Sequence, residues 1–284
     1  MVREFKLINN KKQEFSLMDI EKYCLLTEPT GLGYSYSTSY EQLANVFVTN
    51  LRQLEQGVIS GIANFNSYDN YKKLVDFIEQ SEGLKILYRI PFEDSTIDYY
   101  RDVEIQSLSK TQKQTDGIIK ETLTFNCLNL WYEENTTIYR TEALSNELRW
   151  NFKWDSIFND NSNKSFEYKN CGHINAPLTL EIDGAVSNVA ICVYVGKTLI
   201  QEVKIKTSIL KNEKLFYSSK ENEFSIKKIK EDQTEEDLFD LDVIDFENNN
   251  VVSIPKNQIC EIKLKADTAI ENAKITIFPQ YKCV

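Results

Sequence analysis

His173 is the only histidine in the chain, and it lies two residues after Cys171. A thiol and an imidazole at this spacing are two of the four ligands that a structural zinc site requires, but the sequence marks no second pair. A catalytic triad or a cysteine–histidine pair would also have to use this one imidazole. We interpret the segment as a polar loop before a strand at residues 177–183, and we predict no metal site and no catalytic residue.

The densest run of carboxylates, residues 231–247, raises the question of calcium binding or acid–base chemistry. An EF-hand loop needs a glycine at its sixth position, and this run contains no glycine. Asp240 and Asp242 have the residue types of a glycosidase pair, but spacing along the chain does not set the distance between carboxyl groups in space. We interpret the run as a solvated acidic loop, and the sequence makes no positive case for an enzyme.

The nine glycines form neither of the glycine-rich patterns that bind nucleotide phosphates. The nearest approach is Gly31 and Gly33, which precede an alternation of aromatic and small residues at Tyr34 to Tyr36. This pattern is typical of a turn that enters a strand. We therefore expect no cofactor.

Six cysteines are far apart, and most lie in apolar, strand-like sequence. The chain has no C-x-x-C pair and no regular cysteine spacing that would indicate a disulfide framework. The first residues also lack the apolar core of a secretory signal. We expect free thiols in a protein made in the cytoplasm.

The composition of the 284-residue chain is that of a globular protein, with 42% hydrophobic and 27% charged residues. A net charge of −10 repels phosphate backbones, so nucleic-acid binding is not expected as the primary activity. No apolar run approaches the ~20 residues that cross a bilayer, and we expect a soluble protein without membrane insertion. The length predicts one large domain or two ordinary ones.

The first half of the chain alternates between apolar and polar residues, as strands do, apart from one segment with helical periodicity. That segment places apolar residues at positions 71, 74, 75 and 78, which share one helix face. We predict a helix over residues 68–81, with Asn66 or Ser67 at its N-cap and Gly83 closing its C-terminus in the left-handed conformation. Strands are expected to end at Pro91, to span 99–107 and to span 118–130.

After residue 133 the periodicity fades, and it resumes beyond residue 164. We place the domain junction near residue 135, with domains at 1–135 and 136–284, although Trp150 and Trp154 could belong to either side. Many short strands separated by polar turns indicate a β-sandwich in the second domain. The expected strands cover residues 178–182, 189–195, 199–205, 215–217, 224–229, 259–264 and 273–278.

The order of these elements resembles that of a known family. A strand set, the segment LLTEPTGLG at residues 25–33, a strand pair, the helix and strands ending near residue 132 are similar to the N-terminal domain of distal tail proteins from long-tailed, non-contractile phages and prophages of Gram-positive bacteria. Residues 171–184 resemble the first long strand of the galectin-like, jelly-roll C-terminal domain of these proteins. The resemblance implies a mainly β chain with one helix, in which a sandwich or barrel-like ring domain precedes a galectin-like sandwich.

The resemblance also implies a structural function without catalysis. Such proteins form sixfold rings at the end of the tail tube and join it to the tail-tip protein, which carries the tail-associated lysin. They also support receptor-binding proteins during host adsorption and leave a channel for DNA. In that picture residues 1–135 form the ring at the virion tail tip, and the acidic net charge suits a channel that must not retain phosphates.

Ring formation requires a contact between subunits, and exposed strand edges are a natural way to build one. We expect residues 34–65 to contribute, because this stretch is strand-rich and carries many apolar and aromatic residues. Val46, Phe47 and Val48 are our candidate interface residues.

Two other readings remain open. The galectin-like domain could be a cell-wall carbohydrate-binding module, with an aromatic platform formed by Tyr194, Phe216, Tyr217 and Phe224, although most aromatic residues of a sandwich belong to its core. Alternatively, the chain could be a neighbouring baseplate or tail-tip component, or part of a tail-derived particle from a resident prophage.

Overall fold

The computed structural model describes residues 3–91, 95–140, 163–238 and 251–284. Two compact units are present. The first comprises Met1–Glu133 together with Tyr281–Val284, and the second comprises Glu134–Gln280. The last four residues therefore return to the first unit after the chain has built the second.

The first unit is organised around an antiparallel sheet in the order β2-β1-β7-β8-β9-β6-β3, with β10 and β22 paired beside this path. Buried and half-exposed residues alternate along its strands, as the period of two predicts; Phe5 and Leu7 are buried whereas Lys6 is not. The two ends of the sheet approach each other, since the Leu26 amide donates to the Leu17 carbonyl across 2.8 Å. The strands are β1 (Glu4–Asn9), β2 (Glu14–Ser16), β3 (Leu25–Thr30), β6 (Val58–Phe65), β7 (Leu84–Pro91), β8 (Thr96–Leu108), β9 (Ile119–Cys127), β10 (Trp131–Tyr132) and β22 (Gln280–Tyr281).

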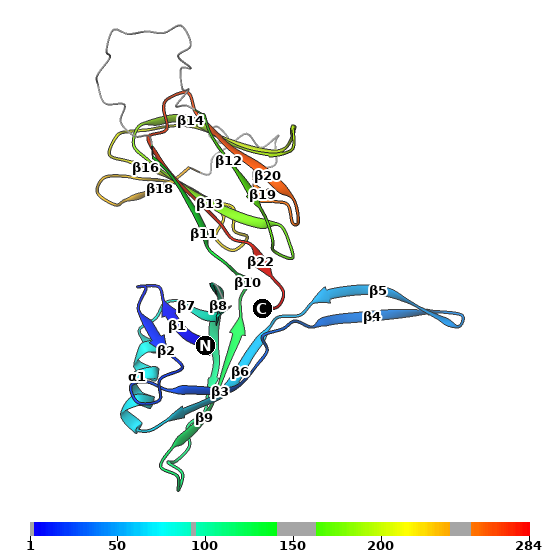
Figure 1. The fold of residues 1–284 in the computed structure, drawn as a ribbon, viewed down its shortest axis with the longest axis vertical. Helices are drawn as coiled ribbons and strands as arrows, with labels where there is room; N and C mark the ends of the chain where they lie inside the picture. The colour runs from blue at the N-terminus through cyan, green and yellow to red at the C-terminus, as the bar shows by residue number, and fades with distance from the viewer. Residues whose placement is uncertain (1–2, 92–94, 141–162, 239–250) are drawn as a thin grey trace. The chain divides into compact units, whose positions relative to one another are not determined.

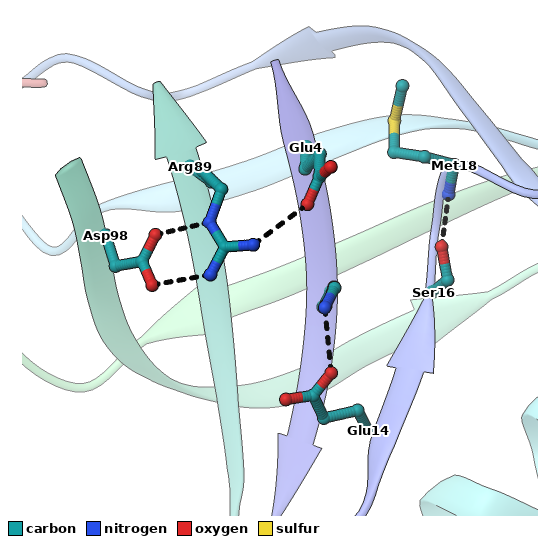
Figure 2. A network of polar contacts seen from close by, with 7 residues as sticks. Glu4, Glu14, Ser16, Met18, Arg89 and Asp98 are labelled. Carbon is teal, nitrogen blue, oxygen red and sulfur yellow. Dashed lines mark hydrogen bonds and ion pairs between the residues drawn. The ribbon is translucent and has the colours of Figure 1, made fainter. Parts of the chain in front are cut away.

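Charged side chains on these strands reinforce the pairing. The guanidinium of Arg89 on β7 donates two hydrogen bonds, of 2.6 and 2.7 Å, to the carboxylate of Asp98 on β8. It also reaches Glu4 on β1 across 3.3 Å, so one side chain links three neighbouring strands (Figure 2). On the same sheet, Lys6 donates to Glu14 of β2 across 2.8 Å.

The single helix of the described chain, α1 (Tyr68–Glu79), confirms the helical prediction. Ser67 is its N-cap and accepts a hydrogen bond from the Asn70 amide, while Leu74 is buried in the core. The prediction for the C-terminus was wrong, because Gly83 does not adopt a positive φ. The helix ends instead at Gln80 in a right-handed conformation, and the hydroxyl of Ser81 donates to the Phe77 carbonyl.

The second unit is a sandwich of two antiparallel sheets, β11-β21-β13-β16-β17-β18 with β19 attached, and β12-β20-β14-β15. Side chains from both sheets form one continuous apolar core, and the mainly β class with a single helix is confirmed. The strands are β11 (Asn135–Arg140), β12 (Asn163–Lys169), β13 (Ala176–Asp183), β14 (Val186–Val195), β15 (Thr198–Ile209), β16 (Lys214–Ser218), β17 (Ser225–Ile229), β18 (Glu235–Asp237), β19 (Ser253–Ile254), β20 (Ile259–Lys265) and β21 (Asn272–Ile277).

A separate two-stranded sheet leaves the body of the first unit (Figure 1). It consists of β4 (Tyr36–Leu43) and β5 (Val46–Leu54), and residues 36–54 are called the arm from here on. Figure 1 shows the arm extending away from β3 and β6, the strands that flank it in the sequence.

Candidate assembly surface

The arm is exposed along almost its whole length. Every residue of β5 is exposed, and β4 has only two half-buried positions. The three predicted interface residues lie at the start of β5, where Val46 is 63%, Phe47 68% and Val48 46% exposed. Leu43, Leu51 and Tyr40 on the same ribbon are also more than half exposed.

The register of the ladder divides the arm into two faces, because residues paired across antiparallel strands project to the same side. Leu43 pairs with Val46 and Gln42 pairs with Phe47, so Val46 and Phe47 point to opposite faces. One face therefore carries an aliphatic stripe, whereas the other carries aromatic rings. The aliphatic stripe consists of Leu43, Val46, Val48 and Leu51; the aromatic face carries Tyr36, Tyr40 and Phe47 together with Leu54.

Such a ribbon lacks the stabilisation that a strand obtains from a core. An isolated two-stranded hairpin is only marginally stable in water, and exposed contiguous apolar patches mark interaction sites. In the described structure, neither the aliphatic stripe nor Phe47 at the tip is covered. The arm is therefore a surface that would gain apolar burial by contacting another chain, at roughly 25 cal/mol for each Å² removed from water.

Close packing at the base of the arm restricts its direction. Gly31 has a φ of +81°, and a Cβ there would lie 1.8 Å from the Val58 carbonyl oxygen, so this position excludes a side chain. At the end of the returning strand, Gly57 packs against the guanidinium of Arg101, where a Cβ would lie 2.4 Å from Nη2. The side chain of Gln56 also donates to the Cys127 carbonyl across 3.1 Å.

Arg101 is itself buried, and its pKa is lowered because burial disfavours the charged form. Its Nε donates to the Asn129 carbonyl across 2.8 Å, and its guanidinium carbon lies 5.5 Å from the ring centroid of Trp131. A buried cation therefore packs on the flank of Gly57 at the base of the arm.

A second exposed apolar area lies on the body of the first unit. Val58 begins β6, and Leu128 follows the end of β9; both are about two-fifths exposed. Val58 pairs with Asn126 of β9, and Leu128 follows two residues later, just beyond the end of that strand. This area offers an apolar surface to another chain.

The four aromatic residues proposed as a sugar platform do not share one exposed face. Tyr217 is fully buried, its hydroxyl accepts from the Val252 amide across 3.0 Å, and burial raises its pKa to about 12. Phe224 packs against the same core, edge-on to Tyr217 at 6.3 Å. Phe216 is half-buried on β16, whereas Tyr194 belongs to the other sheet.

Tyr194 has charged neighbours on the adjacent strand. Lys265 donates to its hydroxyl across 3.3 Å, and the ammonium of Lys263 lies 5.0 Å from its ring centroid. This arrangement places one half-buried ring between two cations on β20. It does not form a platform of several rings.

The other residue types that could do chemistry are dispersed. Cys171 and His173 lie in a loop before β13, as predicted, and both are exposed. All six cysteines are free, which confirms the thiol prediction. Among the residues that the structure describes, no three His, Cys, Asp or Glu side chains gather as metal ligands.

The acidic run at residues 231–247 was predicted to be a loop, and this prediction is wrong for part of the stretch that the structure describes, residues 231–238. Residues 235–237 form strand β18 instead of a loop, and Glu235 pairs with Lys227 across 2.7 Å. Glu236 likewise pairs with Lys230 across 3.0 Å. Asp240, Asp242 and Asp245 lie outside the described residues, as do Trp150 and Trp154.

The sequence pattern places the interface candidates on a strand but does not reveal a projecting arm. Residues 44–48 have the alternation of a continuous strand, whereas Ala44 and Asn45 form the two-residue turn at the tip, with Ala44 at a φ of +54°. This turn contains Asn45 but no glycine, so it lacks the Asn-Gly or Asp-Gly pair that usually signals a two-residue hairpin. A detectable signal is that Val48, Phe47 and Leu51 of β5 pair with the polar residues Glu41, Gln42 and Ser39 of β4.

Comparisons with known proteins agree with this architecture. Residues 4–128 match the family model of the distal tail protein N-terminal domain. Solved structures also share the fold at low sequence identity, among them the following two. A chain of the phage P2 baseplate in its activated conformation with calcium has a TM-score of 0.67 at 16% identity, with 100% of each chain covered. SPP1 Dit (gp 19.1), described as a paradigm of the hub adsorption apparatus in phages that infect Gram-positive bacteria, has a TM-score of 0.55 at 14% identity, with 96% of this chain and 98% of that chain covered.

No curated protein matches the sequence of the chain. The family match to the first unit and the fold shared by both units nevertheless point the same way. The resemblance to distal tail proteins is therefore confirmed, and the chain is similar to structural components of phage baseplates. Within the described residues, no helix is long and apolar enough to cross a membrane.

Proposed function

We propose, from the match of residues 4–128 to the distal tail protein N-terminal domain, that the chain is a structural protein of a phage or prophage tail that assembles with copies of itself into a six-membered ring. The ring joins the tail tube protein to the tail-tip protein, which carries the tail-associated lysin. It supports receptor-binding proteins during host adsorption. Residues 1–135 form the ring together with the C-terminal residues 281–284, residues 136–280 form the sandwich, and the protein has no catalytic function.

The exposed arm is the observation that carries this proposal. Its apolar side chains are uncovered in the described chain, and its direction is restricted at the base by Gly31 and Gly57. A contact between the arm of one copy and the body of the next is heterologous, and such contacts close into a ring when the rotation between copies permits. The apolar area at Val58 and Leu128 is our candidate for the receiving surface.

The charge of the chain supports a passage for DNA. A lumen that nucleic acid must traverse should not bind phosphates by ion pairs, and the net charge of −10 is of the required sign. The protein is made in the cytoplasm of the bacterial host and functions at the tail tip of the virion.

The test is the absolute mass of the purified full-length chain, measured by light scattering after size exclusion and supported by negative-stain images. We expect one ring of six copies, or two stacked rings, with a central hole. A strict monomer over a wide concentration range, both alone and with the tail tube protein, would contradict the proposal.

A matched pair of variants locates the contact. Phe47 is 68% exposed at the tip of the arm. Phe47→Asp places a charge there and should release monomers from the six-membered ring without a change in the unfolding midpoint. Leu210→Asp places the same charge at a 63% exposed residue of the second unit and should leave the ring intact. If Phe47→Asp still forms an intact ring, the tip of the arm is not part of the interface.

A further inference from the structure

We infer that the C-terminal segment Tyr281–Val284 sets the direction of the arm, with Lys282 as a positioning residue for assembly. This inference rests on the proposed ring function. The segment lies outside the residues that match the family model, 4–128, and belongs to the first unit although the whole second unit precedes it in the chain.

The contact between the segment and the arm is direct. The ammonium of Lys282 donates a hydrogen bond of 2.6 Å to the hydroxyl of Tyr36, and it lies 5.3 Å from the centroid of the same ring. Tyr36 is the first residue of β4 and pairs with Leu54, the last residue of β5. Lys282 therefore contacts the arm at its base, where both strands leave the body.

A second cation completes this arrangement. The guanidinium carbon of Arg52 lies 4.0 Å from the centroid of the Tyr36 ring, so two cations approach one aromatic side chain. Tyr34 packs edge-on against Tyr36 at 5.4 Å. The hydrogen bond from Lys282 lowers the pKa of the Tyr36 hydroxyl, which provides a spectroscopic signature of the contact.

The segment is itself anchored, so Lys282 does not extend from a free tail. Tyr281 packs edge-on against Tyr99 of β8 at 5.3 Å, and Val284 packs against the core of the first unit. Residues on both sides of Lys282 thus fix it to the body. This anchoring lets the lysine act as a brace between the body and the arm.

Lys282 contacts the arm at its base, where a small change in angle produces a large displacement of the tip. The longer strand of the arm has nine residues. At about 3.3 Å per residue the arm is roughly 30 Å long, so a tilt of about 10° at the base moves the tip by about 5 Å. A shift of that size would move Phe47 off its partner surface. Holding the arm in its bound direction before assembly also reduces the ordering cost of binding.

The test compares variants of the full-length chain. Lys282→Ala should raise the protein concentration needed for ring assembly at least tenfold. Its unfolding midpoint should stay within experimental error of that of the parent. Lys282→Arg should restore most of the assembly, because its guanidinium can still donate to the Tyr36 hydroxyl. Cys283→Ser is the matched control at the adjacent exposed residue and should assemble like the parent.

The pH titration of tyrosine absorbance separates positioning from general stability. The difference between the parent and Tyr36→Phe isolates the Tyr36 phenol, whose ionisation should move to higher pH in Lys282→Ala. In a Tyr36→Phe background, Lys282→Ala should weaken assembly no further. Full assembly of Lys282→Ala, or additive losses in the double variant, would overturn the inference.

The direction of the arm can be measured independently of ring formation from the distance between two spin labels, attached to cysteines introduced by Asn45→Cys and Lys72→Cys. Cys171 and Cys283, the exposed native cysteines, are first replaced by serine so that they do not react. Lys282→Ala should broaden the distance distribution between the labels even if the parent proves to be a monomer. That result would sustain the inference while the ring proposal fails. An unchanged distribution would overturn the inference whatever the mass of the parent.

Discussion

The indole Nε1 of Trp131 donates a hydrogen bond to the backbone carbonyl of Leu32 across 3.2 Å, linking residues that are 99 positions apart. Trp131 is fully buried and lies on β10, whereas Leu32 lies in the loop that leads into the arm. A core side chain thus holds the loop from which the exposed arm departs. Stability of the first unit and direction of the arm are coupled through this bond.

Trp131→Phe should destabilise the first unit by about 2–4 kcal/mol, because the Leu32 carbonyl loses its partner and the smaller ring leaves a cavity. Urea denaturation of the full-length chain measures this loss. Tyr34→Phe, which changes a half-exposed ring near the same loop, should shift the midpoint little. Equal midpoints for Trp131→Phe and the parent would show that the bond contributes nothing.

Gly31→Ala should destabilise the chain by about 3 kcal/mol or more, or prevent folding, because the position combines a φ of +81° with contact to the Val58 carbonyl. Gly33→Ala is the control two residues later, where no atom lies within 4 Å of the position that an added methyl would occupy and φ is not positive. Thermal unfolding of the two variants checks the difference. Similar midpoints for both would mean that the base of the arm tolerates a side chain.

Both faces of the arm should be covered in the assembly, because apolar residues project from each. Val48→Lys changes the aliphatic stripe and Tyr40→Lys changes the aromatic face. We expect each variant to reduce the mass measured by light scattering, with little effect on the unfolding midpoint. If only one of them releases monomers, the other face of the arm stays in solvent.

The ion pair between Glu213 and Lys228 should contribute to stability in a pH-dependent way. The Lys228 ammonium lies 2.8 Å from the Glu213 carboxylate, and its hydrogen bond lowers the pKa of that carboxyl from its usual value. A carboxyl whose pKa is lowered by folding contributes stability above its unfolded pKa and loses it as pH falls through the folded value.

Urea denaturation between pH 3 and pH 7, at roughly one-unit steps around the reference carboxyl pKa, measures this dependence. Glu213→Gln should lower stability at pH 7, and its effect should shrink as pH falls toward 3 and the parent carboxyl gains protons. Glu221→Gln, at an exposed glutamate in the turn before β17, should have little effect at either pH. A constant difference between Glu213→Gln and the parent would exclude the ion pair as its cause.

Local patterns predicted much of the fold. Alternation around Phe5 and Leu7, and apolar spacing around Leu74, mark which residues face the core, and both signals depend only on neighbours in the chain. β11 and β12 escaped prediction because their sequences are rich in polar residues, and their pairing with β21 and β20 comes from distant parts of the chain. Val46, Phe47 and Val48 remain predicted interface residues; the structure shows that they are exposed on a ribbon whose shape the sequence did not predict.

The sequence by itself determined the mainly β class, the helix that begins after Ser67, the free thiols and the resemblance to distal tail proteins, because each depends on residue type and short-range spacing. Only the tertiary structure decided that the apolar residues of β5 are uncovered, that Tyr217 is buried, and that Lys282 contacts Tyr36. Apolar residues in a strand have the same local pattern whether they face a core or solvent. Which of the two occurs depends on pairings between residues far apart in the chain, and those are set when the whole unit packs.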